Sequence, residues 1–218
     1  KNKNCFKFVH ISTDEVFGPA PDNFAFKEND EHNPSNPYAA AKSGGEMMVK
    51  AYRVTHKLPA TITRSMNIFG ERQHPEKFIP LVINRVLNGE KVIIHGHPNK
   101  TRAGSRFYIH ARNVADGYLF LLNNIDKAIG EDFHITGEKE VDNLEMAQLI
   151  AKIIGKPLKY EIVDFHSSRP GHDLRYALDD EKIRSVGWVP PKTFESSLEK
   201  TVNWLLERDQ WLKSGTYS

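Results

Sequence analysis

The sequence of 218 residues has one cysteine, no marked excess of either charge and no long apolar run. The lone Cys5 excludes an internal disulfide and a cysteine-based zinc site, which fits a reducing compartment. The 30 Lys and Arg residues nearly balance the 28 Asp and Glu residues, so bulk charge gives no support to nucleic-acid binding. No stretch approaches the roughly 20 apolar residues that cross a bilayer, and the first ten residues lack a signal-peptide core. We therefore expect a soluble, cytoplasmic protein that binds neither nucleic acid nor membrane.

A glycine-rich turn is also missing. No G-x-G-x-x-G or similar motif follows a predicted strand, so the sequence lacks the device with which a dinucleotide-binding fold holds a pyrophosphate. The chain also begins directly on a predicted strand. Both features suggest that an N-terminal portion lies outside this sequence. Roughly a hundred residues would be needed for the βαβαβ half that is missing.

Metal-binding patterns are absent as well. The ten histidines are scattered, with no H-E-x-x-H motif and no histidine–carboxylate spacing typical of a metal site. His95 and His97 flank one glycine in a predicted loop. We therefore predict no metal site and expect most histidines to face solvent.

The rest of the chain alternates strand and helix patterns. The predicted strands are 5–11, 60–65, 91–96, 105–110, 131–136 and 158–163. The predicted helices are 38–57, 75–89, 111–124, 142–155, 179–186 and 193–207, and the predicted loops are 18–37 and 164–173. This alternation predicts an α/β fold with a largely parallel sheet.

Tyr38 and Lys42 form a Y-x-x-x-K motif on a predicted helix. The i,i+4 spacing puts both side chains on one helix face, where an ammonium group would lower the pKa of a phenol toward the working range of a general base. Such a pair occurs by chance in very roughly a third of chains of this length, so the motif alone is weak. A surface pair on an amphipathic helix is the alternative interpretation.

Two adjacent acids, Asp14 and Glu15, follow Thr13 at the end of the first predicted strand. In a continuing strand neighbouring side chains point to opposite faces, so one acid would point into the core. Either the strand has ended at this point or the acids serve chemistry. Solvated loop acids remain the alternative on residue type alone.

Four separated blocks carry a family resemblance. They are "HISTDEVFG" (10–18), "NPYAAAKSGGEMMVKAY" (36–52), "TRSMNIFGERQHPEKFIPL" (63–81) and "SSRPGHDLRYALDDEKIRSVGW" (167–188). In this order they resemble the extended short-chain dehydrogenase/reductase family, specifically the dTDP-glucose 4,6-dehydratases. The resemblance runs from residue 6 to about 207 and corresponds to the C-terminal two thirds of the family's chain.

The resemblance implies an architecture and an activity. Residues 1–67 and 97–136 would form the C-terminal part of a Rossmann-type parallel sheet that binds NAD. Residues 68–96 and 137–218 would form a smaller mixed α/β domain that binds a nucleotide-sugar. The implied reaction is NAD-dependent dehydration of a nucleoside-diphosphate hexose, dTDP-glucose to dTDP-4-keto-6-deoxyglucose, by a homodimer.

The resemblance also implies roles for the five catalytic candidates. Tyr38, as phenolate, would take the proton of the sugar 4-hydroxyl, and Thr13 would hydrogen-bond the reacting oxygen. Lys42 would hold the nicotinamide ribose and lower the pKa of Tyr38. Glu15 would remove the C5 proton while Asp14, as a neutral acid, protonates the departing 6-hydroxyl.

Further positions match ligand-binding residues of the family. Ile68 would lie beside the nicotinamide, and the implied nucleotide-sugar contacts are Asn67, Lys77, Asn143, Arg169 and His172. An arginine fork suits a diphosphate because it donates two parallel hydrogen bonds. An ordinary Pro-Gly turn at 167–172 and a helix cap at 142–143 are the alternative interpretations.

The sequence departs from the family pattern in three places, and the missing glycine-rich turn is one of them. Phe17 stands where the family has a tyrosine. The family's phosphate-binding arginine falls in a stretch that is two residues longer here, so we take Arg102 as the expected ligand and Arg106 as the fallback. A nucleotide-sugar epimerase or decarboxylase, and a fragment that binds sugar nucleotides without catalysis, remain alternative functions.

Overall fold

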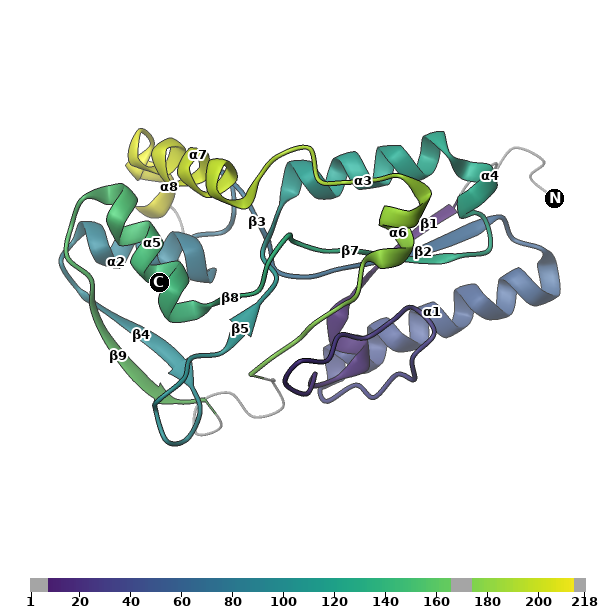
Figure 1. The fold of residues 1–218 in the computed structure, drawn as a ribbon, viewed down its shortest axis with the longest axis horizontal. Coiled ribbons are helices and arrows are strands. Elements are labelled where there is room, and N and C mark those ends of the chain that lie inside the picture. Colours follow the sequence, from purple (N-terminus) through teal and green to yellow (C-terminus); the bar gives the residue numbers. More distant parts are fainter. Residues whose placement is uncertain (1–7, 166–173, 214–218) are drawn as a thin grey trace.

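The computed structural model describes residues 8–165 and 174–213 (Figure 1). Cys5 therefore lies outside the described residues, as do Arg169 and His172. In chain order the elements are β1 (Phe8–Thr13), the 3-10 helix η1 (Asp14–Phe17), α1 (Pro37–His56), β2 (Ala60–Ser65), β3 (Ile68–Phe69), α2 (Phe78–Leu87), β4 (Lys91–Gly96), β5 (Ser105–Arg106), β6 (Ile109–His110), α3 (Ala111–Asn123), α4 (Ile125–Ala128), β7 (Asp132–Ile135), β8 (Val141–Asp142), α5 (Asn143–Ile154), β9 (Lys159–Asp164), α6 (Glu181–Val186), α7 (Phe194–Leu206) and α8 (Asp209–Lys213).

A three-stranded parallel sheet, in the order β1-β2-β7, forms one half of the molecule. Thr13 pairs with Ser65, and Ser65 pairs with Ile135, so the carboxyl ends of all three strands meet at one edge. Helix α1 runs along one face of this sheet, and α3 runs along the other (Figure 1). The predicted α/β class with a parallel sheet is confirmed.

Helix α1 has clear sequence signals at both ends. The Asn36 side chain accepts a hydrogen bond from the backbone N–H of Ala39 at 2.9 Å, and Pro37 occupies the first turn, where a missing N–H costs nothing. Lys57 ends the helix in the left-handed conformation, with φ of 53°. The predicted helix 38–57 is thus found one residue earlier at each end.

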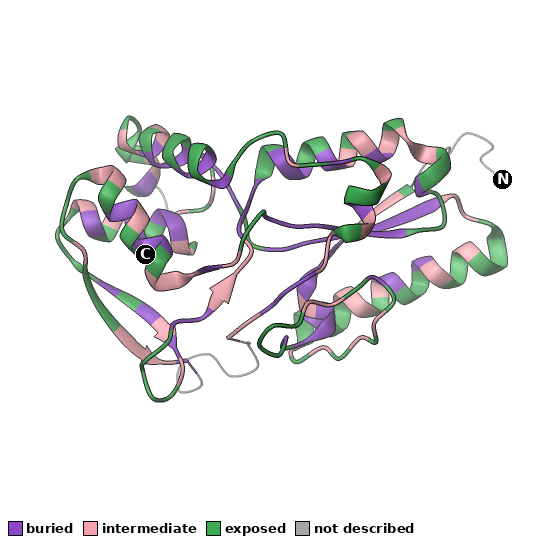
Figure 2. Cartoon of the chain, in the orientation of Figure 1, coloured by how far each residue is buried: buried purple, intermediate pink, exposed green. Residues whose placement is uncertain are grey.

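The second half of the molecule is built around an apolar core. Helices α2, α5 and α7 pack together through buried side chains such as Val82, Ile150 and Val202. Strands β4 and β9 form a parallel pair beside them. Figure 2 shows these helices buried on their inner faces and exposed on their outer faces. Hydrophobic burial is the main force holding this half together.

The predicted strand 105–110 is wrong as one continuous element. The chain forms two short strands there, because β5 pairs antiparallel with β8 while β6 pairs parallel with β3. The two intervening residues carry the chain from one pairing partner to the other. The late segment 181–188 also returns to the sheet half, where Ile183 and Trp188 pack in one cluster with Phe133 of β7.

The expectation that most histidines face solvent is also wrong. Among the described residues, only His56 and His74 are exposed, whereas His110 and His134 are buried. His110 accepts a hydrogen bond from the backbone N–H of Arg112 and so caps α3. The backbone N–H of His134 donates a hydrogen bond to Glu28 Oε1 at 3.1 Å. His134 makes hydrogen bonds through its backbone N–H and both ring nitrogens. His110 Nε2 lies 3.3 Å from the Glu71 carboxylate.

Candidate functional site

Thr13, Asp14 and Glu15 lie at the end of β1, at the carboxyl edge of the sheet. The strand ends at Thr13, whose side-chain oxygen accepts a weak hydrogen bond from the backbone N–H of Glu15 at 3.4 Å and caps η1. The same hydroxyl donates to Asp14 Oδ1 at 2.8 Å. The strand therefore stops before the two acids, and a 3-10 turn presents them.

The two adjacent acids have different surroundings. Asp14 is only 6% exposed, and burial raises its pKa to about 6, although the Thr13 hydroxyl and the Arg106 charge oppose that rise. Glu15 is half-buried, and Asn36 Nδ2 donates to its Oε2 at 2.9 Å. Asp14 is thus not a solvated loop acid. A carboxyl with a pKa near 6 retains its proton in mildly acidic solution, which suits a group that donates a proton.

Tyr38 and Lys42 approach the same edge from the first two turns of α1. Tyr38 is 55% exposed, and its pKa is raised above the ordinary value by partial burial and then by the Glu15 carboxylate. The Thr13 hydroxyl acts in the opposite direction. Lys42 Nζ donates to the backbone carbonyl of Ile11 at 2.6 Å. The expected lowering of the Tyr38 pKa is therefore not found, because partial burial and then the Glu15 carboxylate raise this pKa. The Lys42 ammonium is bonded to the backbone of β1.

The two arginine candidates have different partners. Both terminal nitrogens of Arg102 donate to the exposed carboxylate of Asp22, at 3.0 and 2.6 Å. Arg106 is half-buried, and its guanidinium lies 4.8 Å from the centre of the Tyr176 ring. Its charge lowers the pKa of Asp14. Arg106, rather than Arg102, is therefore the arginine that acts electrostatically on Asp14.

The remaining described candidates differ in exposure and in local structure. Asn67 has a positive φ of 40° and follows β2, and the neighbouring Ile68 leaves 39% of its surface exposed. Lys77 is exposed immediately before α2. Asn143 is the first residue of α5, which Asp142 caps by accepting from two backbone N–H groups at 2.8 Å each. The helix-cap interpretation is thus correct for Asp142, and the Asn143 amide is left for other contacts.

Sequence reasoning missed a buried charge network behind the site. Arg64 of β2 is fully buried, and it donates through Nε and Nη2 to the carboxylate of Glu46, with the shortest distance at 2.5 Å. It also reaches Asp132 Oδ2 at 3.2 Å and lies over the Phe17 ring at 5.0 Å. Since Glu46 follows Lys42 by one helical turn, this network joins the Tyr38 helix to β2. An arginine inside a predicted buried strand was the available signal.

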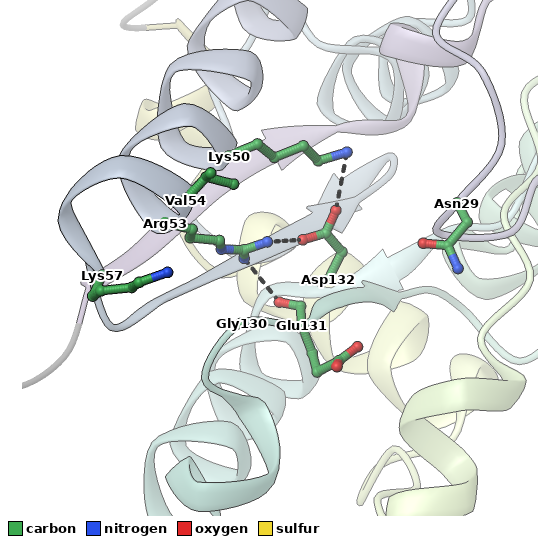
Figure 3. Close-up of a pocket in the computed structure, with 8 residues that line it drawn as sticks. All are labelled: Asn29, Lys50, Arg53, Val54, Lys57, Gly130, Glu131 and Asp132. Atoms are coloured by element: carbon green, nitrogen blue, oxygen red, sulfur yellow. Dashed lines mark hydrogen bonds and ion pairs between the residues drawn. The ribbon is translucent and has the colours of Figure 1, made fainter.

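A cavity of about 450 Å³ lies at the opposite, amino end of the strands (Figure 3). Figure 3 shows Lys50 and Arg53 pointing to the Asp132 carboxylate, which Arg53 binds at 2.7 Å. The residues that line the cavity are Asn29, Lys50, Arg53, Val54, Lys57, Gly130, Glu131 and Asp132. Ligands of open α/β sheets bind outside the carboxyl ends of the strands, so this cavity is not the candidate site.

Neither a membrane-spanning helix nor a metal-binding cluster is present in the described part of the chain. Residues 8–165 and 174–213 contain no helix long and apolar enough to cross a membrane. Over the same ranges, no group of three or more His, Cys, Asp or Glu side chains is arranged to hold a metal ion.

The parallel sheet, with a hydroxyl, two acids and a Y-x-x-x-K helix at its carboxyl edge, defines a Rossmann-type protein of the short-chain dehydrogenase/reductase class. The chain belongs to the GDP-mannose 4,6 dehydratase family, whose model matches residues 1–201. A curated relative, dTDP-glucose 4,6-dehydratase 1 of Escherichia coli strain K12, is 39% identical over 233 residues. That match covers 99% of this chain and 63% of the relative, so the chain spans less than two thirds of the relative's length.

Solved structures give the same family assignment. The dTDP-glucose 4,6-dehydratase from Bacillus anthracis, in complex with NAD, aligns with a TM-score of 0.85 and 32% identity. The alignment covers 96% of this chain and 65% of that one. The UDP-glucuronic acid 4-epimerase from Bacillus cereus aligns with a TM-score of 0.83 over 93% of this chain and 62% of that one. Its identity is 24%, so it supports the fold alone.

Proposed function

We propose that this chain is the C-terminal part of an NAD-dependent nucleotide-sugar 4,6-dehydratase that converts dTDP-glucose to dTDP-4-keto-6-deoxyglucose. The observation that carries the proposal is the acid pair after β1. Asp14 is buried with a pKa of about 6, while the adjacent Glu15 is half-buried and bonded to Asn36. Elimination of water from a sugar needs one acid and one base on neighbouring carbons, and these two carboxyl groups have different environments.

Tyr38, Lys42 and Ile68 are the residues we assign to the cofactor. When bound, NAD would accept a hydride from sugar C4 and later return it to C6. The Lys42 ammonium and the exposed apolar surface of Ile68 suit a ribose hydroxyl and a nicotinamide ring, respectively. Tyr38 takes the proton of the 4-hydroxyl, and Thr13 hydrogen-bonds the same oxygen. The Thr13 hydroxyl, which lowers the Tyr38 pKa, supports this pairing.

The two acids then carry out the dehydration. The new 4-ketone acidifies C5, and Glu15 removes the C5 proton. Asp14, in its neutral form, donates its proton to the departing 6-hydroxyl, which leaves as water. Burial of Asp14 favours the neutral carboxyl, and the Glu15 charge acts in the same direction.

The nucleotide-sugar would lie beside Arg106, with Asn143, Asn67 and Lys77 around it. We place Arg106 at the diphosphate in preference to Arg102, because Asp22 occupies the Arg102 fork and Arg106 acts on Asp14. Arg169 and His172, outside the described residues, complete the proposed contacts. Both residues precede Leu174 in the sequence. The Leu174 carbonyl accepts a hydrogen bond from Arg106 Nη1 at 2.5 Å.

We also propose the domain division, the assembly and the compartment. Residues 1–67 and 97–136 would be the cofactor domain, and 68–96 and 137–218 the nucleotide-sugar domain. The separate apolar core around α2, α5 and α7 supports this division, with 181–188 reaching back to the sheet. Exposed Met47, Met48 and Tyr52 on α1 fit a homodimer contact, and one unpaired cysteine fits the cytoplasm.

The proposed function is tested by identifying the product that the protein forms when it is expressed from its natural coding sequence. Incubation with dTDP-glucose and NAD should give a sugar nucleotide that has lost one water, as measured by mass spectrometry. Asp14→Asn and Glu15→Gln should each reduce dehydration by about a hundredfold or more, whereas Glu31→Gln, at an exposed acid in the loop between η1 and α1, should not. A product of unchanged mass would indicate an epimerase. Binding of dTDP-glucose without any product would indicate a non-catalytic module.

A further inference from the structure

The hydroxyl of Tyr108 is hydrogen-bonded to the side chain of Asn143. Tyr108 lies between β5 and β6, is 5% exposed and packs in the apolar core of the α2, α5 and α7 half. Its hydroxyl donates to Asn143 Oδ1 at 2.6 Å. Burial and the nearby Asp142 carboxylate raise the pKa of this phenol, so it remains a neutral donor.

Asn143 lies against the strand that carries Arg106. Its backbone N–H donates to the carbonyl of Gly104 at 2.9 Å, and Ser105 pairs with Asp142 in the β5–β8 ladder. A Cβ atom on Gly104 would lie 3.7 Å from Asn143 Nδ2 and 2.8 Å from the Leu174 carbonyl. The absence of a side chain at Gly104 therefore allows the Leu174 backbone to approach the start of β5 closely, with the Asn143 amide at ordinary contact distance.

The Asn143 amide has one acceptor end and one donor end. Tyr108 occupies the acceptor, Oδ1, from the core side. Within residues 8–165 and 174–213, no group accepts a hydrogen bond from Nδ2, and Asn143 is half-buried. A tyrosine hydroxyl that donates to Oδ1 therefore leaves Nδ2 as the end of the amide available to a ligand.

We propose that Tyr108 is a positioning residue that turns the donor end of Asn143 toward the diphosphate of the bound nucleotide. This inference rests on the proposed function, which places that diphosphate beside Arg106. Phosphate oxygens are hydrogen-bond acceptors, so only Nδ2 makes a favourable contact with them, whereas Oδ1 in the same place repels them. Without the Tyr108 hydroxyl, the amide is free to rotate, and the correct orientation is populated only part of the time.

The first test is removal of the hydroxyl alone in Tyr108→Phe. Calorimetric titration of the 218-residue chain with thymidine diphosphate should show a dissociation constant about five- to tenfold higher than that of the unaltered chain, the effect of one hydrogen bond. Tyr118→Phe removes a hydroxyl from α3, in the other apolar cluster, and should leave the constant unchanged. Thermal unfolding of each variant confirms that the titration is performed on folded protein.

A double-mutant cycle separates positioning from general destabilisation. Asn143→Ala should weaken binding, and Tyr108→Phe added to it should have no further effect, because the hydroxyl then has no amide to orient. An equal loss from Tyr108→Phe in both backgrounds overturns the inference, as does unchanged binding by Tyr108→Phe itself. Failure of the unaltered chain to bind thymidine diphosphate overturns the proposed function and this inference together, so the two failures are distinguishable.

Discussion

The helix that carries Tyr38 and the helices of the second half are held in place by different forces. Helix α1 buries only Ala39, Glu46 and Val49 along its length. Helix α2, half as long, buries five apolar side chains, including Val82 and Ile83. Helix α1 thus buries few apolar side chains against the sheet and adds one buried charge, Glu46, whereas the other half is held by apolar packing.

This difference matters because the two kinds of contact have different geometric demands. Hydrophobic burial is non-directional and tolerates small sliding of one element along another. The Arg64–Glu46 pair is directional, with Nε and Nη2 both bonded to one carboxylate. A polar contact one turn after Lys42 therefore holds the helix at one register along β2, and Tyr38 and Lys42 with it.

The largest expected effect is the loss of the Arg64 side chain. Arg64→Met leaves the fully buried Glu46 carboxylate without its main partner, and the free energy of unfolding should fall by about 3–5 kcal/mol. Urea denaturation followed by circular dichroism measures it. The double variant Arg64→Met with Glu46→Met should recover most of the loss, since no buried charge is left alone. A loss below about 1 kcal/mol would contradict the view that α1 depends on this pair.

Ile83→Ala gives the matched comparison in the apolar half. It removes a fully buried side chain from α2 and should cost about 2–5 kcal/mol through lost burial and a residual cavity. No charged group moves in this variant, so the pKa of Asp14, measured by NMR titration, should stay unchanged. A shifted Asp14 pKa in Ile83→Ala would show that the apolar half also positions the acids of the sheet half, and it would remove the distinction between the two halves.

The next effect in size is a pH dependence of the free energy of unfolding, which comes from Asp14 in the sheet half. The pKa of Asp14 is about 6 in the folded chain, against an ordinary value of 3.8. Between these values the folded state holds a proton that the unfolded state has lost, so stability falls as pH rises from about 4 to about 6. Asp14→Asn should therefore be more stable than the unaltered chain near pH 7, by about 2–3 kcal/mol, and no more stable near pH 4.

Urea denaturation at a series of pH values checks this sign. Glu15→Gln, half-buried beside Asp14, is the control and should not remove the slope. A slope that survives in Asp14→Asn would show that another group is responsible. Buried Glu28, whose pKa is also raised by burial, would be the first to examine.

The sequence predicted most of the fold because its helices have local signals. Asn36 before Pro37 and Asp142 before Asn143 mark helix starts, and Gly155, with φ of 73°, marks a helix end. The strand at 105–110 was predicted as one element because β-propensity does not show that two partners share it. Pairing partners far away in the chain decide that, and no local pattern contains them.

In the candidate site, too, the sequence showed local features and did not show contacts between distant residues. Thr13, Asp14 and Glu15 were found from their position at a strand end. The buried partners of Arg64 and the difference between Arg102 and Arg106 were not found, because they depend on residues 18 to 80 positions away. The raised pKa of Tyr38 was also missed, since it comes first from partial burial and then from the Glu15 carboxylate, and both depend on the folded structure.

The smallest expected effect is at the contact between Arg102 and Asp22, which joins the long loop after η1 to the loop after β4. Both side chains are about half exposed, so solvent screens the pair although its two hydrogen bonds are short. Arg102→Ala should change the free energy of unfolding by about 0–1 kcal/mol, and less at high salt. It should also leave thymidine diphosphate binding unchanged, whereas Arg106→Ala should weaken binding. A larger effect of Arg102→Ala on binding would return the diphosphate contact to Arg102 and make this surface pair part of the site.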